Sequence, residues 1–103
     1  MKVSKLVRDK IPEIIGRNGR LVSIKYVSGE EHCRYLLMKL NEEVRELRRN
    51  VSIEEVADVL EVLDAILKVC LNASLSDALR VKERKKELLG GFEGGAVATY
   101  ITD

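Results

Sequence analysis

The sequence predicts a mainly α-helical bundle with a small peripheral two-stranded β element. Apolar residues recur every three or four positions in residues 30–49 and 52–71, which is the period of an amphipathic helix. Two other segments alternate apolar and polar residues, as strands do. The chain has 103 residues, 46% of them hydrophobic and only one a proline, so we expect a single folded domain spanning residues 1–103.

The first element expected is a short helix. Asp9 stands where it can cap a helix through residues 10–19. Pro12 falls in the first turn of this helix, where proline is tolerated. Gly16 or Gly19 ends it.

Two alternating segments predict the β element. Within residues 20–28, Val22, Ile24 and Tyr26 lie on one side of an extended chain. Residues 96–101, with the sequence AVATYI, alternate in the same way. We therefore expect the two segments to pair.

Three longer helices are expected between these segments. The first covers residues 30–49 and ends in a turn at Asn50–Val51. Ser52 caps the second, which continues to about Leu71. The third covers residues 74–89 and stops at the glycine-rich loop GGFEGG.

Charge and cysteine content limit the classes of function. Eighteen Lys+Arg against seventeen Asp+Glu leave a net charge of +1, which argues against nucleic acid or an anionic membrane as the partner. The N-terminus lacks the apolar stretch of a signal peptide, which favours a cytoplasmic protein. Cys33 and Cys70 form no CxxC pair, so we expect core thiols in a reducing compartment rather than a disulfide or a zinc site.

Two acidic residues lie on an unexpected side of the helix at 52–71. At about 100° per residue, one apolar side of this helix centres on Leu60 and the opposite apolar side on Val62. Glu55 and Asp58 fall on the Val62 side rather than on the solvent stripe between the two. Acidic side chains on a packing side of a helix lose solvation, so their presence there is not explained by keeping the protein soluble.

The preceding helix supplies two more acids at the matching level. Glu43 and Glu46 are neighbours on its surface. In an antiparallel hairpin that reverses near residue 50, Glu46 lies level with Glu55 and Glu43 level with Asp58. Four carboxylates in one patch repel each other, so we expect a cation among them.

Oxygen ligands of this kind suit Mg²⁺, or Mn²⁺, with free positions for water and phosphate oxygens. A di-iron carboxylate bundle needs a Glu-x-x-His motif on each of two helices. The one histidine, His32, follows no such glutamate.

Structural interpretations without a metal exist for three of these acids. Glu55 also fits a capping box with Ser52. Glu43 and Glu46 also fit a solvated flank that pairs with arginines of their own helix. The capping box leaves Asp58 unexplained, and the coincidence of acids on two opposing helices favours the metal site.

The motifs EEVRE (42–46) and EVAD (55–58) resemble the EExxE…ExxD signature of the MazG-type all-α nucleoside triphosphate pyrophosphohydrolases. KLVRDKIPEII (5–15), EEVADVLEVLDAI (54–66) and GGFE resemble the small phosphoribosyl-ATP pyrophosphohydrolase-like branch of that superfamily. The resemblance implies an all-α NTP pyrophosphatase-like bundle that holds Mg²⁺ between two adjacent helices. It maps the metal ligands onto Glu43, Glu46, Glu55 and Asp58.

The resemblance also implies roles in catalysis and substrate binding. Water attacks the nucleotide, and Glu46 or Glu43, as the catalytic carboxylate, would orient that water. Basic residues would bind the phosphates, although each taken alone also fits a solvated or helix-end position. The candidates are Arg8, Lys10, Arg84, Lys85 and Lys86.

The function expected is therefore Mg²⁺-dependent hydrolysis of a nucleoside triphosphate to its monophosphate and pyrophosphate, of the house-cleaning type. The alternatives are a phosphoribosyl-ATP pyrophosphohydrolase of histidine biosynthesis and a non-catalytic helical module for dimerisation or regulation. The second apolar side of the helix at 52–71 must be covered, by the terminal helices or by another copy. We favour a homo-oligomer, either a dimer or a dimer of dimers.

Overall fold

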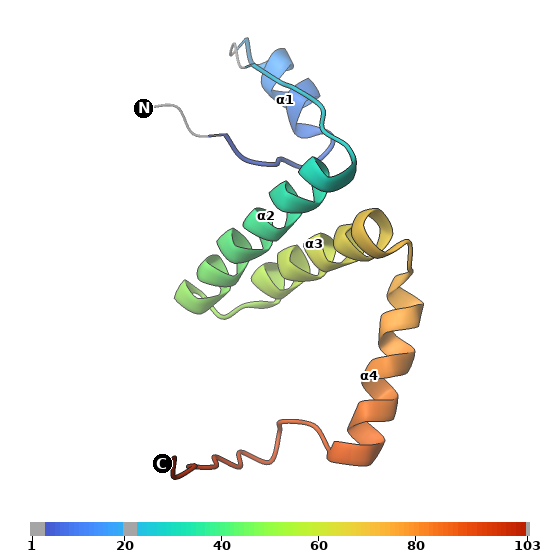
Figure 1. Cartoon of the computed structure of the whole chain (residues 1–103). Helices are drawn as coiled ribbons and strands as arrows, with labels where there is room; N and C mark the ends of the chain where they lie inside the picture. The colour runs from blue at the N-terminus through green and yellow to red at the C-terminus, as the bar shows by residue number, and fades with distance from the viewer. Residues whose placement is uncertain (1–3, 20–22, 103) are drawn as a thin grey trace. The chain divides into compact units, whose positions relative to one another are not determined.

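The computed structural model describes residues 4–19 and 23–102, and these residues form four helices (Figure 1). They belong to two compact units, Met1–Ala73 and Ser74–Asp103. The predicted mainly α-helical class is confirmed. Within the described ranges, no helix is long and apolar enough to cross a membrane.

Helix α1 spans Ile11–Arg17 and contains the predicted Pro12 in its first turn. The prediction that Asp9 caps it is wrong: Lys10 is the N-cap residue, and its side chain makes no capping hydrogen bond. Proline is the second residue of the helix and has no N–H, so one of the usual targets of a capping side chain is missing.

The predicted β element is not found among the described residues. Residues 23–28 and 96–101 have no strand pairing, and Val22 lies outside the described residues. A strand exists only when a neighbour accepts and donates its backbone hydrogen bonds. The two segments belong to different compact units. A pattern of alternating apolar and polar residues does not by itself specify a partner strand.

Helices α2 (Gly29–Arg49) and α3 (Ile53–Leu71) form an antiparallel hairpin, as their periodicity predicted. The chain reverses at residues 50–52. The Ser52 hydroxyl then accepts a hydrogen bond from the backbone N–H of Glu55 at 3.3 Å, which fixes the start of α3. Asn72, in the left-handed region with φ 49°, ends the helix.

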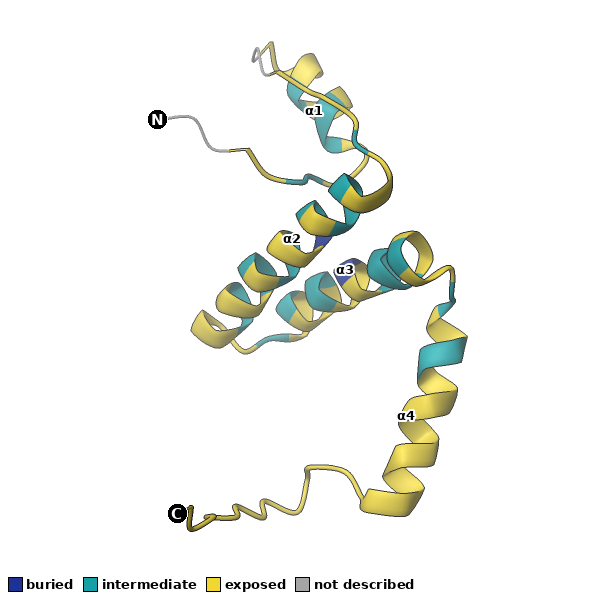
Figure 2. Cartoon of the chain, in the orientation of Figure 1, coloured by how far each residue is buried: buried dark blue, intermediate teal, exposed yellow. Residues whose placement is uncertain are grey.

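The buried core lies between these two helices (Figure 2). Among the described residues the most buried are Leu36 of α2, 2% exposed, and Val62 of α3, 8% exposed. The Val62 side of α3 therefore packs on α2. On the Leu60 side of α3, Leu60 is 49% exposed. The acids that share the Val62 side are thus held close to α2.

Helix α4 (Leu75–Leu89) lies in the second unit and has the predicted ends. The Ser74 hydroxyl accepts from the backbone N–H of Asp77, whose carboxylate accepts from the N–H of Ser74, completing a capping box. These hydrogen bonds lower the pKa of Asp77. The helix ends at Gly90, whose φ of +84° is readily adopted only by glycine.

Candidate metal and nucleotide site

Three of the four predicted acids converge at the turn end of the hairpin. Glu43 of α2 and Glu55 and Asp58 of α3 each offer a carboxylate oxygen, and these oxygens all lie within 4.8 Å of one another. Glu55 and Asp58 are three residues apart and so share one face of α3, while the antiparallel pairing brings Glu43 level with them. All three are half-buried. We refer to them as the acid triad.

Glu46, the fourth predicted ligand, is not a member of this group. Its carboxylate pairs with Arg49 on its own helix at 3.3 Å, and its side chain is 46% exposed. Its negative charge nevertheless acts on Glu55. Glu46 therefore lies beside the triad, as a carboxylate engaged by one arginine.

The electrostatic environment of Glu55 is unfavourable to its charged form. Desolvation comes first, and the negative charges of Asp58, Glu46 and Glu43 add to it, so the pKa of Glu55 is raised. Among the described residues Glu55 has no ion pair. A cation placed between the three carboxylates would relieve this repulsion.

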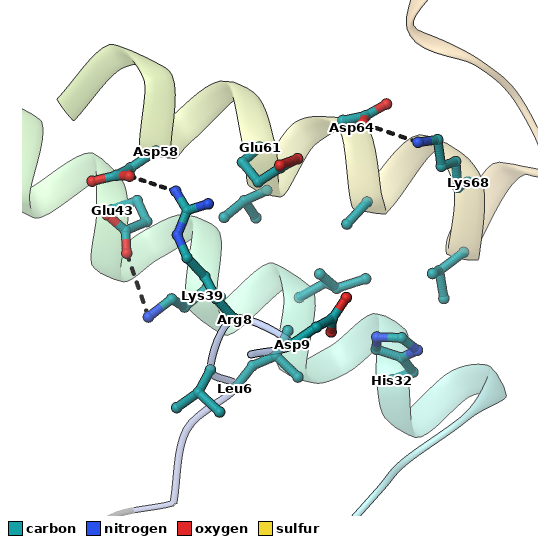
Figure 3. Close-up of a pocket in the computed structure, with 15 residues that line it drawn as sticks. Leu6, Arg8, Asp9, His32, Lys39, Glu43, Asp58, Glu61, Asp64 and Lys68 are labelled. Carbon is teal, nitrogen blue, oxygen red and sulfur yellow. Dashed lines mark hydrogen bonds and ion pairs between the residues drawn. The ribbon is translucent and has the colours of Figure 1, made fainter. Parts of the chain in front are cut away.

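Two basic side chains partly neutralise the other members of the triad (Figure 3). Arg8, in the N-terminal segment, donates from Nη2 to Oδ1 of Asp58 at 2.6 Å. Lys39 lies one turn before Glu43 on α2, and its Nζ is 3.4 Å from Oε1 of Glu43. Each of these two carboxylates therefore has one protein cation.

Two members of the triad, Glu43 and Asp58, line a cavity of about 490 Å³. Its walls are residues 6–9, α2 between His32 and Glu43, and α3 between Asp58 and Val69. Glu43 and Asp58 lie at one end, and His32 and Lys68 at the other (Figure 3). Pockets for small ligands and cofactors commonly have volumes of roughly 300–1,000 Å³. The cavity therefore has room for a nucleotide-sized ligand next to the acids.

The structure places the predicted phosphate-binding residues differently. Arg8 lines the cavity, whereas Lys10 is the N-cap of α1 and does not line it. The three remaining candidates are exposed on α4, in the second compact unit, and their role stays a prediction. They are Arg84, Lys85 and Lys86.

Sequence reasoning missed several residues of the cavity. Lys39 is one of them, although a basic residue four positions before Glu43 on a helix is the spacing of an ion pair. Asp64 and Lys68 of α3 form an ion pair at 3.1 Å and line the cavity. His32 also lines it. No sequence pattern indicated that the N-terminal segment forms the third wall.

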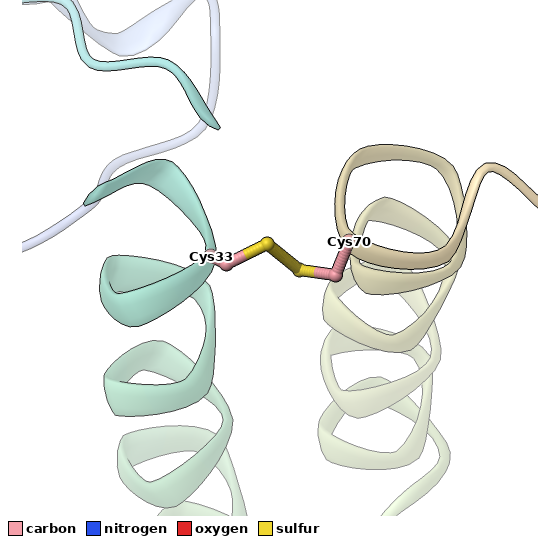
Figure 4. Close-up of a disulfide and its surroundings, with 2 residues drawn as sticks. All are labelled: Cys33 and Cys70. Atoms are coloured by element: carbon pink, nitrogen blue, oxygen red, sulfur yellow. A yellow bond between two sulfur atoms is a disulfide. The ribbon is translucent and has the colours of Figure 1, made fainter. Parts of the chain in front are cut away.

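The cysteines overturn a further prediction. Cys33 and Cys70 form a disulfide, with their Cα atoms 5.7 Å apart (Figure 4). A separation of 37 residues hid this pairing, because only the antiparallel packing of α2 and α3 brings the start of one helix beside the end of the other. Cys33 and Cys70 are therefore not the free core thiols that the sequence suggested.

The comparisons with known proteins leave the family open. No protein-family model matches this sequence, and no solved structure matches it. The chain is 48% identical over 46 residues to an uncharacterized protein of Mycolicibacterium smegmatis. That match spans 45% of this chain and 47% of the mycobacterial protein. The chain thus matches about half the length of that relative.

Proposed function

We propose that the chain is a divalent-cation-dependent nucleotide pyrophosphohydrolase that cleaves a nucleoside triphosphate into its monophosphate and pyrophosphate. The observation that carries the proposal is the acid triad, two members of which, Glu43 and Asp58, line one end of the cavity of about 490 Å³. The sequence resemblance to MazG-type enzymes, which is carried by the same acids, supports the same reaction.

The donor set fits a hard divalent cation. Glu43, Glu55 and Asp58 would hold the ion, because all three donors are oxygens within one short span. Mg²⁺ and Mn²⁺ favour such ligands and leave positions for water and phosphate oxygens. When bound, the ion would neutralise charge on the phosphates and orient them for attack.

Glu46 is the candidate general base. It lies next to the triad but outside it, and its Oε1 pairs with Arg49, so Oε2 is the oxygen that can accept a proton. We assign Glu46 to orient the attacking water and to take one proton from it, so that the water oxygen attacks a phosphorus atom of the nucleotide. The phosphoanhydride bond between the α and β phosphates then breaks, and pyrophosphate leaves.

Arg8 and Lys39 pair with two members of the triad. Their ion pairs with Asp58 and Glu43 supply positive charge that a metal would otherwise supply. A divalent cation held by the carboxylates would take over this role and leave both side chains free in a cavity that they already line. Their guanidinium and ammonium groups would then bind phosphate oxygens of the substrate.

A panel of nucleotides tests this function. Pyrophosphate release should be measured for the nucleoside triphosphates and for phosphoribosyl-ATP, with and without Mg²⁺. We expect turnover that requires Mg²⁺. The nucleotide preferred would separate the house-cleaning reaction from the histidine-biosynthetic one.

Two substitutions localise the activity. Glu43→Gln and Asp58→Asn should each lower kcat/KM at least about 100-fold, because each removes a charged ligand from the proposed metal site. Glu54→Gln is the matched control: this acid also lies in the first turn of α3 but is exposed and outside the triad. Full activity in both test variants would contradict the proposed site.

A non-catalytic helical module is the second candidate. The exposed apolar side chains on one side of α3, with Val56 43% and Leu60 49% exposed, favour it because such a surface suits a protein partner. The nucleotide panel decides between the two. If the folded protein, supplied with Mg²⁺, turns over none of the nucleotides, the non-catalytic module is favoured over the hydrolase.

A further inference from the structure

The disulfide closes the end of the hairpin that the turn leaves open (Figure 4). Residues 50–52 join α2 and α3 at the acid end. Cys33 lies near the start of α2 and Cys70 one residue before the end of α3, so their bond ties the opposite end. The two helices are thus covalently joined at both ends.

The disulfide borders an open hollow on the surface. Cys33 and Cys70 are both half-buried, and they line this hollow, which has a volume of about 500 Å³. Arg34, an exposed residue, also lines the hollow. Glu30, which is also exposed, lines the same hollow and offsets the charge of Arg34. A thiol of low molecular mass would therefore find room beside the bond.

The same end of the hairpin forms the far wall of the nucleotide-sized cavity. Val69, next to Cys70, lines both the hollow and the cavity. His32, next to Cys33, lines the cavity as well. From Cys33 to Glu43 is ten residues along α2, roughly 15 Å at about 1.5 Å per residue. The bond therefore sets the helix spacing at the end away from the acids.

We propose that the Cys33–Cys70 disulfide is a reversible redox latch that fixes the width of the cavity at this end. Reduction by a small thiol such as glutathione would free the two helix ends while residues 50–52 still hold the acid end together. The consequence for turnover rests on the proposed hydrolase function, whereas the movement of the helix ends does not.

The exchange balances in two steps. A glutathione thiolate attacks one cysteine sulfur, the S–S bond breaks, and the other cysteine leaves as a thiolate that takes up a proton. A second glutathione thiolate attacks the mixed disulfide and releases the remaining cysteine, which is also protonated. Two electrons and two protons thus reach the protein, and two glutathione molecules become one oxidised glutathione. Excess oxidised glutathione drives the reverse reaction.

The first experiment follows the bond itself. The full chain is equilibrated at a series of ratios of reduced to oxidised glutathione, quenched with acid, alkylated and weighed by mass spectrometry. We expect a reversible transition between no alkylated cysteine and two, with the helical circular dichroism retained. Reduction that occurs only when the protein unfolds would overturn the latch.

Amide hydrogen exchange then locates the effect. In the reduced protein, exchange should accelerate at least about threefold in residues 29–36 and 66–71 and stay unchanged in residues 44–57, because only the first set loses its covalent tie. Uniform acceleration, or none, would overturn the proposal. The double variant C33S/C70S is the control and should not respond to glutathione; an equal response there would also overturn it.

Kinetics test the link to the cavity. Reduction should raise the KM for the nucleotide at least about threefold and leave Mn²⁺ affinity unchanged, since the acid triad lies at the other end. An unchanged KM would refute the control of the cavity by the latch. If neither redox state hydrolyses any nucleotide, the proposed function fails, and the hydrogen-exchange pattern alone still decides the latch.

Discussion

Glu55 experiences opposing effects at a single residue. As an acid in the first turn of α3 it benefits from the helix dipole. Desolvation and the charges of Asp58, Glu46 and Glu43 act against its ionisation, and they dominate, because its pKa is raised. The side chain is therefore placed at some cost to the metal-free protein, as expected of a group positioned for a ligand.

This conflict predicts that removing the Glu55 charge stabilises the protein at neutral pH. With a folded-state pKa above the unfolded one, the folded state binds more protons between the two values, so stability falls as pH rises through that window. Glu55→Gln should therefore raise the melting temperature at pH 7 in EDTA. Thermal unfolding followed by circular dichroism checks this, and the gain should vanish below the ordinary pKa of glutamate. A variant less stable than wild type at pH 7 would contradict the prediction.

Arg8 carries a second prediction at this scale. If it competes with the metal for Asp58, Arg8→Gln should tighten Mn²⁺ binding. The pair is half-exposed, at 56% and 39%, so its worth is at most about 1 kcal/mol and the gain at most about fivefold.

Isothermal titration calorimetry measures the Arg8 effect. Lys5→Gln is the matched control, because Lys5 lies in the same N-terminal segment but pairs with Glu42, outside the triad. Equal affinity in wild type and the Arg8 variant would show that the guanidinium does not compete.

Helix α3 positions two of the three acids through its cap and its apolar side. The Ser52 hydroxyl fixes where the helix starts, and Val62 fixes which side packs on α2. Together these determine the level and the direction of Glu55 and Asp58. The prediction of this helix from the Ser52 cap and the apolar period was confirmed, because both signals are local.

The cap can be tested directly. Ser52→Ala removes the acceptor for the Glu55 N–H and should destabilise the protein by about 1 kcal/mol. Urea unfolding measures it. Ser28→Ala is the matched control, because Ser28 is the N-cap residue of α2 but its side chain makes no capping hydrogen bond. A cost no larger than that of the control would show that the cap contributes nothing.

The whole chain has a small core for its length. Among the described residues only Leu36 and Val62 are buried, while Val56 and Leu60 are about half-exposed. Chains of this size bury limited apolar surface, and association is a common way to cover more. We therefore expect a dimer in solution, as the two-sided helix suggested.

Sedimentation equilibrium tests the assembly. At micromolar concentration the mass should be close to twice the monomer mass of 11.6 kDa. Leu60→Gln should shift the equilibrium toward monomer, whereas Val51→Ser, an equally apolar exposed position in the turn, should not. A monomer across the whole concentration range would contradict the prediction.

The sequence by itself determined the features that depend on near neighbours along the chain. These are the ends of α2, α3 and α4, the caps at Ser52 and Ser74, and the side of α3 that carries Glu55 and Asp58. Local hydrogen bonds and a period of 3.6 residues encode them directly. It also placed Glu43 correctly, because the turn at residue 50 fixes the register of the hairpin.

Only the tertiary structure decided the rest. It separated Glu46 from the triad, brought Arg8 and Lys39 to the acids, joined Cys33 to Cys70 and left the described parts of the alternating segments, 23–28 and 96–101, unpaired. Except for the Lys39 pair, each outcome depends on distances between residues far apart in the chain or on the direction of one side chain. Such distances follow from how the helices and the N-terminal segment pack. Neither the helical period of the apolar residues nor the spacing of the motif residues specifies that packing.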